Sequence, residues 1–291
     1  MGEKVEQFYE KHYKKLIIIP LLILIFSLGV LVFNQVTKGE VIQRDVELKG
    51  GMEITIDKPG LTAGEVESVL KTKYEDFSVR ELGDFSSKKS LGVTIKISNA
   101  EDSELRELLI SKLGVEESQY NTRIINAAFA ESFYKSLIVV LIISFILMSI
   151  TVTISFRTFI PSVAVISAAV IDILGALAIF SLMGMKLSAP SITAFLLVIG
   201  YSIDTDVLLT TRMLKRRDST LLKRMVGAIK TGLTMSITTI VAMVVALTFA
   251  VNPVLKEIFM IIAIAITIDI ASTYLANAPL LIWYAKRKNI Q

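Results

Sequence analysis

Three aspartates lie near the middle of apolar stretches that are long enough to cross a lipid bilayer: Asp172, Asp204 and Asp269. A carboxylate at mid-membrane costs on the order of 2.5 to 3.5 kcal/mol. Intramembrane acids usually face the interior of a helix bundle or a wet cavity, and they commonly mark the path of an ion or a proton. We therefore expect these residues to do more than anchor the chain, and we take them as candidates for an ion or proton relay.

A fourth candidate, Asp206, lies two residues after Asp204. In a helix each residue rises about 1.5 Å and turns about 100°, so Asp206 lies about 3 Å closer to Arg212 and roughly 200° round the helix. The two carboxyls cannot share one narrow face. We expect one to point into the bundle and the other toward a partner, a lipid-water boundary or a neighbouring helix.

The fifth apolar stretch offers possible partners for an acid. Thr231, Thr234 and Thr238 recur at spacings of three and four, which places their hydroxyls along one helix face. They are expected either to bond a carboxyl or line a wet path, or to bond their own i−4 carbonyls. Lys230 near the start of this stretch is expected either to pair with an acid or to extend its ammonium group to the interface.

A structural role is the alternative for the acids themselves. Burial favours the protonated form of a carboxyl, so Asp172 and Asp269 could be neutral, hydrogen-bonded acids that join helices. Small residues around Asp172 would let a neighbouring backbone approach closely. Close packing and a buried acid are compatible.

Composition excludes several kinds of chemistry. The 291 residues include no cysteine and one histidine, His12. Disulfides and thiolate metal sites are therefore absent, and one histidine cannot build a metal site or a histidine-dependent hydrolase. We expect no enzyme activity, no metal or cofactor and no nucleic-acid partner.

The apolar residues, within a chain that is 53% hydrophobic, are grouped in blocks typical of transmembrane helices. The first, 16–33, follows several lysines and lacks a small-residue cleavage site, which favours an uncleaved first helix over a signal peptide. Five more stretches cover roughly 134–155, 161–183, 190–211, 227–250 and 258–284. The predicted organisation is a terminus at 1–15, a first helix at 16–36, an inserted domain at 37–130, five helices within 131–285 and a second terminus at 286–291.

Lysine and arginine in the short loops predict the orientation. Only Lys186 and Lys256 occupy the short loops on one side. The other side has Lys4, Lys11, Lys14, Lys15, Arg157, Arg212, Lys215, Arg216, Arg217, Lys223, Arg224, Lys286, Arg287 and Lys288. We therefore expect both termini to be cytoplasmic and residues 37–130 to lie outside the cell membrane. The loop at 212–224 is expected to anchor this topology, with binding of a partner or of anionic lipid as the alternative.

The insert has the pattern of a small α+β domain. Strands are predicted at 52–57, 77–81, 91–98 and 119–125. Thr62 with Glu65 predicts a helix start with a capping box, and a second helix is expected from Ser103 to Leu113. The order β-α-β-β-α-β fits a ferredoxin-like domain. The predicted fold is thus an α-helical polytopic membrane protein with six transmembrane helices and an extracytoplasmic ferredoxin-like domain between the first and second.

Two motifs resemble the SecD/SecF family. The segment 45–52, with its Gly50-Gly51 pair, is similar to the region that begins the first extracytoplasmic domain of these proteins. The run Gly200-Tyr201-Ser202-Ile203 inside an apolar stretch, followed by acids and by Arg212, resembles the signature of the SecF branch in its separate-chain, archaeal-like form. The resemblance covers essentially the whole chain.

The resemblance implies a fold of the resistance-nodulation-division superfamily. It also implies a heterodimer with a SecD-like subunit beside a SecY-type channel, where the proton-motive force helps to move a preprotein across the membrane. Bacterial SecF proteins place Asn-Asp after Gly-Tyr-Ser-Ile, whereas this chain has Asp204-Thr205-Asp206. The acid of SecD falls at the position of Asp204, which makes Asp204 the first candidate for the proton site and Asp206 the second. Lys230 is the approximate counterpart of a basic residue in the family.

The proposed cycle is protonation of Asp204 from outside, a shift in helix packing that moves the inserted domain, and release of the proton inward. Two alternatives stay open. One is a transporter of the same superfamily for a small molecule or lipid. The other is an assembly factor that holds the SecD-like subunit and the channel together without transport. The coupling ion could be H⁺ or Na⁺, because a carboxylate with hydroxyl neighbours suits either.

Overall fold

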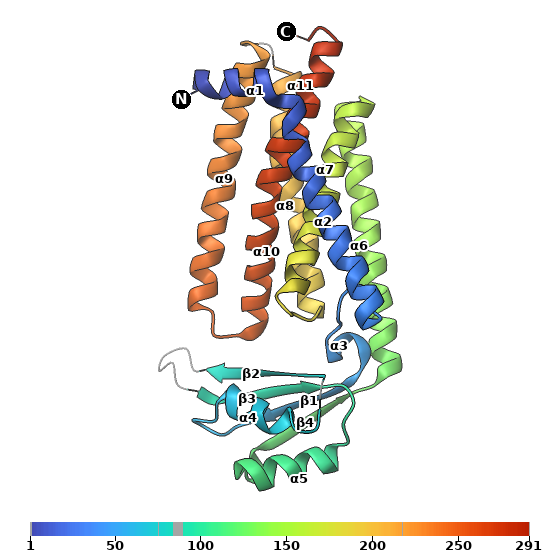
Figure 1. Cartoon of the computed structure of the whole chain (residues 1–291), viewed down its shortest axis with the longest axis vertical. Coiled ribbons are helices and arrows are strands. Elements are labelled where there is room, and N and C mark those ends of the chain that lie inside the picture. The colour runs from blue at the N-terminus through green and yellow to red at the C-terminus, as the bar shows by residue number, and fades with distance from the viewer. Residues whose placement is uncertain (1, 75, 84–89, 217, 291) are drawn as a thin grey trace.

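Six helical segments in the described part of the chain are long and apolar enough to cross a membrane, and they form one bundle (Figure 1). The computed structural model describes residues 2–74, 76–83, 90–216 and 218–290. Met1, Arg217 and Gln291, which belong to the predicted termini and basic loop, lie outside the described residues. The helices of the bundle are α1 (Gly2–Leu16), α2 (Ile18–Lys38), α6 (Ala127–Phe156), α7 (Phe159–Leu182), α8 (Ala189–Leu214), α9 (Leu221–Phe249), α10 (Pro253–Ser272) and α11 (Ala278–Arg287). Of the six segments, one comprises α1 and α2 and another comprises α10 and α11.

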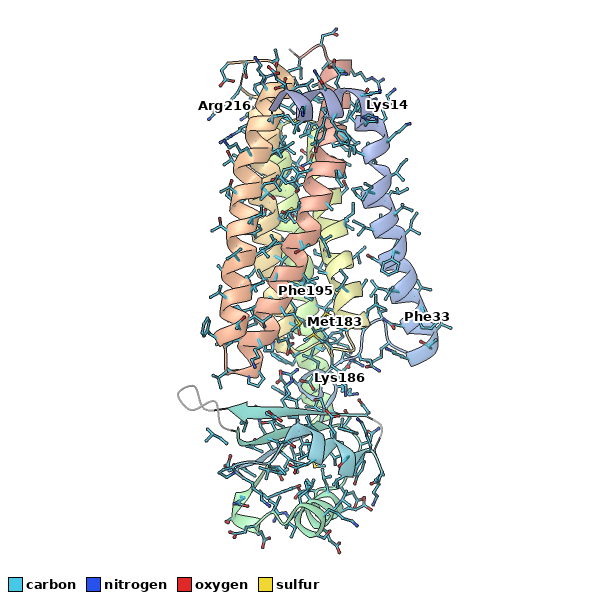
Figure 2. The ribbon with its side chains drawn as sticks, turned by 60° about the vertical axis from the view of Figure 1, so that its left-hand side comes forward. Lys14, Phe33, Met183, Lys186, Phe195 and Arg216 are labelled. Carbon is cyan, nitrogen blue, oxygen red and sulfur yellow. The ribbon has the colours of Figure 1, made fainter. Side chains whose placement is uncertain are left out.

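The bundle has an inner and an outer set of helices. About half of the apolar stretch is buried inside the protein in α7, α8 and the segment of α10, whereas α6 and α9 bury little of their apolar stretches. Small residues permit the close approach of the inner set: a Cβ at Gly175 of α7 would lie 3.0 Å from Ile268 Cδ1 of α10. Apolar side chains such as Phe33 project outward along the bundle (Figure 2). The prediction of six apolar spans is confirmed.

Helix α1 lies across the bundle end that is far from the β-sheet, and the chain bends into α2 at Ile17 (Figure 1). Its apolar side packs into a cluster that includes residues of α8, α9 and α11. The Tyr9 hydroxyl donates to the carbonyl oxygen of Tyr274 at 2.8 Å. Figure 2 shows Lys14 and Arg216 at this same end and Lys186 near the sheet. The amphipathic first helix therefore covers one end of the bundle.

A small α+β domain lies at the other end, between α2 and α6 (Figure 1). Its elements are α3 (Val46–Lys49), β1 (Gly51–Ile56), α4 (Ala63–Leu70), β2 (Phe77–Gly83), β3 (Ser90–Ile97), α5 (Asp102–Leu113), the short 3₁₀ turn η1 (Glu117–Gln119) and β4 (Tyr120–Ile125). The four described strands pair antiparallel in the order β2-β3-β1-β4, with Ile54 opposite both Ile95 and Thr122. The β-α-β-β-α-β order predicted from the sequence is confirmed.

The two faces of this sheet differ. Alternate residues of β1 and β3, among them Ile54 and Ile95, are fully buried in the domain core with residues of α4 and α5. The residues between them, such as Glu53 and Thr94, point to the opposite face. Thr62 and Glu65 form the predicted capping box at the start of α4. Helix α5 begins at Asp102 rather than at Ser103, and its first residues have no side-chain cap.

The Gly50-Gly51 pair joins α3 to β1 in backbone conformations that favour glycine, with φ of 92° and 141°. A Cβ at Gly50 would lie 2.6 Å from the Cα of Ala127, the first residue of α6, and one at Gly51 would lie 2.5 Å from the carbonyl oxygen of Ile97. The motif therefore lets α6 and β3 pack against this joint. The single turn of α3, which Asp45 caps, was not predicted from the sequence.

The connection between α7 and α8 contacts the domain directly. The ammonium group of Lys186 donates to Asp76 at 2.5 Å, and Lys49 donates to the other oxygen of the same carboxylate at 2.5 Å. Backbone hydrogen bonds add to this: Leu187 N donates to Gln43 O at 2.7 Å, and Asp45 N donates to Leu187 O at 2.8 Å. Domain and bundle are thus joined by polar contacts as well as by the chain.

Candidate functional site

Three of the four candidate aspartates meet inside the bundle. Asp172 comes from α7, Asp206 from α8 and Asp269 from α10, and each side chain is essentially inaccessible to solvent. The Thr273 hydroxyl contacts both Asp206 and Asp269, and Ser272, the residue before it, contacts Asp172, so the three carboxyls lie close together. We call Asp172, Asp206 and Asp269 the aspartate cluster.

Asp172 is held by two serine hydroxyls from neighbouring helices. Ser202 of α8 donates to one carboxyl oxygen at 2.6 Å, and Ser272 at the end of α10 donates to the other at 2.5 Å. Ser202 belongs to the Gly-Tyr-Ser-Ile motif, so the structure gives this motif serine a direct contact with an intramembrane acid. The sequence did not pair the two residues, because they are thirty positions apart.

Two threonines and an asparagine surround the other acids. Thr205 lies 3.0 Å from an oxygen of Asp269. The Thr273 hydroxyl lies 2.9 Å from Asp206 and 3.3 Å from Asp269, so it bridges the two carboxyls, although it has one proton to donate. Asn277 donates its amide to Asp206 at 2.7 Å.

Thr273 and Asn277 belong to a π-helical segment, Thr273–Asn277, between α10 and α11. A π-bulge shifts the register of a helix, and such segments are often found at functional sites. Here the two ends of the segment both contact Asp206. The sequence predicted one continuous helix, and the residues 273 and 277 were missed as site residues.

The hydrogen-bond partners that the structure gives these carboxyls are neutral hydroxyls and an amide. In addition, Asp206 Oδ2 and Asn277 Oδ1 are buried without a hydrogen-bond partner among the described residues. Several unbalanced carboxylates in a low-dielectric interior cost far more than neutral acids. The arrangement is therefore suited to holding protons rather than three free negative charges.

Asp204 lies outside the cluster. Its side chain is exposed on the surface of α8. Gly200, one turn earlier, is exposed too, and a Cβ added there would meet nothing within 4 Å. Asp206, by contrast, points into the bundle. The helix geometry that separated the two acids thus places one inside and one on a surface.

In the part of the chain that the structure describes, no hydrogen bond or ion pair joins Lys230, Thr234 or Thr238 of α9 to the aspartate cluster. Lys230, Thr234 and Thr238 are exposed, and both threonines donate to carbonyls four residues earlier, at 2.8 and 2.7 Å. Arg212 donates to Gly227 O and to the Thr231 hydroxyl, each at 2.9 Å, and so ties α8 to α9. The motif residue Tyr201 is half-buried, whereas Gly50 and Gly51 belong to the domain.

Comparison with known proteins gives a consistent family. The family model described as "Protein export membrane protein SecD/SecF, C-terminal" matches residues 107–287. The protein-export membrane protein SecF of Methanothermobacter thermautotrophicus is 37% identical over 287 residues, which cover 94% of this chain and 93% of that protein. SecF of Pyrococcus furiosus is 32% identical over 289 residues, which cover 98% and 96%.

The crystal structure of SecDF from Thermus thermophilus, titled a translocon-associated membrane protein, superposes with a TM-score of 0.71 at 20% identity. The match covers 96% of this chain but 38% of that one. At this identity the likeness shows the fold.

Proposed function

Because this chain belongs to the SecD/SecF family of protein-export membrane proteins, as a SecF, we propose that it assists the passage of preproteins across the cell membrane together with a SecD-like subunit and a SecY-type channel. The chain is a transport component, and the observation that supports an active role is the aspartate cluster. Buried acids are costly in a membrane and commonly mark an ion or proton path, which favours an active role over a passive anchor.

In this proposal the aspartate cluster takes up and releases the coupling ion, with the proton as the first choice. Uptake removes charge from the interface of α7, α8 and α10, and release restores it. One elementary charge that crosses the full membrane potential provides about 2.3 kcal/mol per 100 mV. One or a few such charges are enough to bias two arrangements of packed helices.

Asp204 has a separate role in this proposal. A carboxyl on the lipid-facing side of a helix at this depth is unfavourable, and Gly200 beside it leaves room for a close backbone. We place the SecD-like subunit against this face of α8. In the orientation that the lysine and arginine distribution predicts, the α+β domain lies outside the cell membrane and both termini lie in the cytoplasm.

The test is the export of a signal-peptide-bearing reporter in cells whose only copy of the protein carries Asp172→Asn, Asp206→Asn or Asp269→Asn. An amide of similar shape cannot ionise. We expect each variant to lose export nearly to the level of a deletion while it still assembles with its partner. Asp57→Asn, which changes an exposed aspartate of the domain, is the control and should export normally.

Asp204→Asn tests the proposed interface in the same cells. We expect less SecD-like subunit to copurify with this variant, and export to fall with it. Normal export by all three cluster variants would reject ion coupling through the cluster and favour an assembly factor. Export lost through Asp204→Asn with normal assembly would return Asp204 to the ion path.

A further inference from the structure

The two edges of the sheet are attached to the bundle in different ways. At one edge, β4 is followed by a single residue, Asn126, and then by α6. At the other edge lies β2, and the chain does not pass directly from this strand into a helix of the bundle, because α4 precedes it and β3 follows it. Figure 1 shows this β2 edge below the connection between α9 and α10. The β2 edge therefore depends on side-chain contacts for its position against the bundle.

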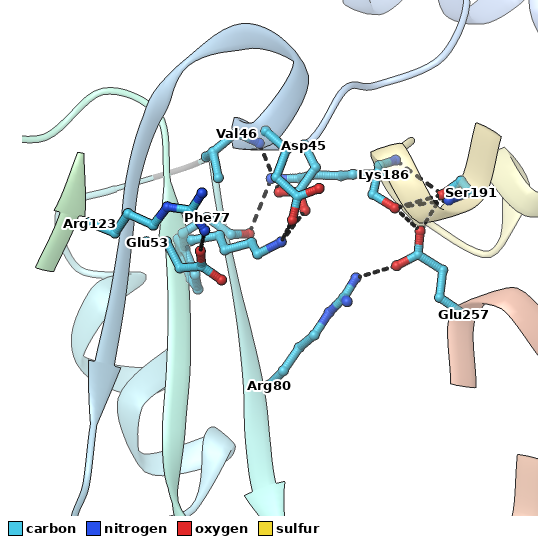
Figure 3. A network of polar contacts seen from close by, with 12 residues as sticks. Asp45, Val46, Glu53, Phe77, Arg80, Arg123, Lys186, Ser191 and Glu257 are labelled. Carbon is cyan, nitrogen blue, oxygen red and sulfur yellow. Dashed lines mark hydrogen bonds and ion pairs between the residues drawn. The ribbon is translucent and has the colours of Figure 1, made fainter. Parts of the chain in front are cut away.

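One such contact joins Arg80 of β2 to Glu257 of α10 (Figure 3). Arg80 Nη2 lies 3.1 Å from Glu257 Oε2, and the glutamate is 2% exposed. Removing the cation from a buried carboxylate leaves an uncompensated charge, which is strongly unfavourable. Gly83 of the same strand approaches Val251, since a Cβ there would lie 3.4 Å from Val251 Cγ1.

The other carboxyl oxygen of Glu257 accepts the hydroxyls of Ser188 and Ser191. These two serines form the capping box at the start of α8. A carboxylate at a helix N-terminus is stabilised by the helix dipole. Arg80 is thus connected, through one buried carboxylate, to both α8 and α10. These are the helices that contribute Asp206 and Asp269 to the aspartate cluster.

A cleft of about 480 Å³ separates the polar face of the sheet from the connection between α9 and α10. Arg80, Glu53 and Lys96 line it from the domain, and residues 251–254 line it from the bundle. The β2 edge is therefore not packed solidly against the bundle, and the Arg80–Glu257 contact spans a gap beside open space. Such an arrangement allows the edge to approach and to withdraw.

We infer that Arg80 and Glu257 are positioning residues that transmit movement between the α+β domain and the helices of the aspartate cluster. The inference rests on the proposed function, because it assigns to that function the contact through which domain and cluster are coupled. Formation of the ion pair holds the middle of β2 against α8 and α10. Its loss frees the strand from Arg80 to Gly83, while the start of β2 stays joined to Lys186 through Asp76 and β4 stays joined to α6.

The experiment measures the position of the domain and export separately. The chain has no cysteine, so spin labels can be placed at two exposed sites, Lys71 in the domain and Phe249 at the end of α9. Their distance distribution is recorded by pulsed electron paramagnetic resonance on the full-length protein. We expect Arg80→Gln and Glu257→Gln each to broaden the distribution and to lower export about fivefold, the lower end of ordinary coupling between sites.

Three further variants make the result specific. The double variant Arg80→Gln/Glu257→Gln should be no worse than either single one, because both remove the same contact. Arg80→Lys keeps the charge and should restore the narrow distribution and most of the export. The pair Arg106 and Glu117 lies in the domain at 2.9 Å and lines neither the cleft nor the bundle, so Arg106→Gln/Glu117→Gln should change neither reading.

The readings also separate this inference from the proposed function. An unchanged distance distribution in Arg80→Gln and Glu257→Gln would overturn the inference whatever happens to export. Broadened distances with normal export would overturn it as well, because the contact would then position the domain without serving the cycle. A third outcome is that the aspartate variants export normally, while Arg80→Gln and Glu257→Gln broaden the distances and lower export. In that case the proposed ion coupling fails, but the role of the Arg80–Glu257 contact is supported.

Discussion

Tyr274 fits into the surface of α9 at a position where only glycine leaves room. A Cβ at Gly232 would lie 2.1 Å from the Tyr274 hydroxyl oxygen. Tyr274 follows Thr273 directly in the π-helical segment, and its carbonyl oxygen accepts the hydroxyl of Tyr9. Through its ring and its backbone carbonyl, Tyr274 therefore connects α9, α1 and the segment that contacts Asp206.

We expect Gly232→Ala to lower the free energy of unfolding by about 1–3 kcal/mol, the usual cost of overpacking. Gly200→Ala is the matched control, because it lies in α8 with nothing within 4 Å of the added methyl group. There the better helix propensity of alanine should give a neutral or slightly positive change. Thermal unfolding in detergent compares the two, and equal effects would contradict the close approach of Tyr274 to Gly232.

The acids show how far single residues can be read from sequence. Apolar surroundings identified Asp172 and Asp269 as intramembrane acids, and helix geometry separated Asp204 from Asp206. The inward side does have a signal in the sequence: Ser202, Asp206 and Thr210 recur every four residues and all three are buried in α8. This polar stripe favours Asp206 over Asp204 as the inward acid. The assignment of Asp204 as the proton site, which came from the family resemblance, remains a prediction. The geometry groups Asp206 with Asp172 and Asp269.

At the scale of elements, the junction at Asp76 has a definite response to acid. Burial raises the pKa of Asp76, but hydrogen bonds from Lys186 and Lys49 outweigh it and hold the pKa at about 2. The pKa is lowered in the folded protein, so the stabilisation is present above the ordinary value near 4 and is lost as the pH falls toward 2.

We therefore expect unfolding measured between pH 6 and pH 2 to show a loss of about 1–2 kcal/mol that Asp76→Asn lacks. The shift alone would give somewhat more, but the side chain is 38% exposed and solvent screening reduces it. Asp57→Asn, at an exposed site, should retain the wild-type profile. A full acid-dependent loss in Asp76→Asn would contradict the assignment to this carboxylate.

Elements were predictable where a local pattern defines them. Alternation in β3, with Val93, Ile95 and Ile97 buried, identified the strand, and Thr62 identified the start of α4. The π-helical segment was not predictable, because Thr273–Asn277 is compatible with an α-helix and its register is set by contacts with Asp206 on another helix. Helix α3 is one turn long and gives no periodic pattern.

At the scale of the whole molecule, the order of elements and the family were readable from the sequence. The Glu257 site was not, because Arg80, Ser188 and Glu257 are far apart in the chain and come together only when β2, α8 and α10 meet. The lysine and arginine distribution predicts the orientation in the membrane, and exposed residues of the structure provide sites at which that orientation can be tested.

Because the chain lacks cysteine, single cysteines can test the orientation. Ser118→Cys in the domain should react with a membrane-impermeant maleimide in intact cells, whereas Lys288→Cys near the C-terminus should react only after the cells are permeabilised. Both side chains are exposed. The opposite labelling pattern would invert the proposed topology, and the single-cysteine variants should be checked for normal export.

The direct passage from β4 to α6 has a mechanical consequence. Asn126 alone separates them, and its side chain caps the helix by accepting from the amides of Ala128 and Phe129. Helix α6 has 30 residues, so it is about 45 Å long. Acting as a lever arm, it would convert a tilt of about 5° at its far end into a displacement of about 4 Å at the sheet. With almost no slack in the linkage, a small rotation within the membrane would become a stroke of the domain.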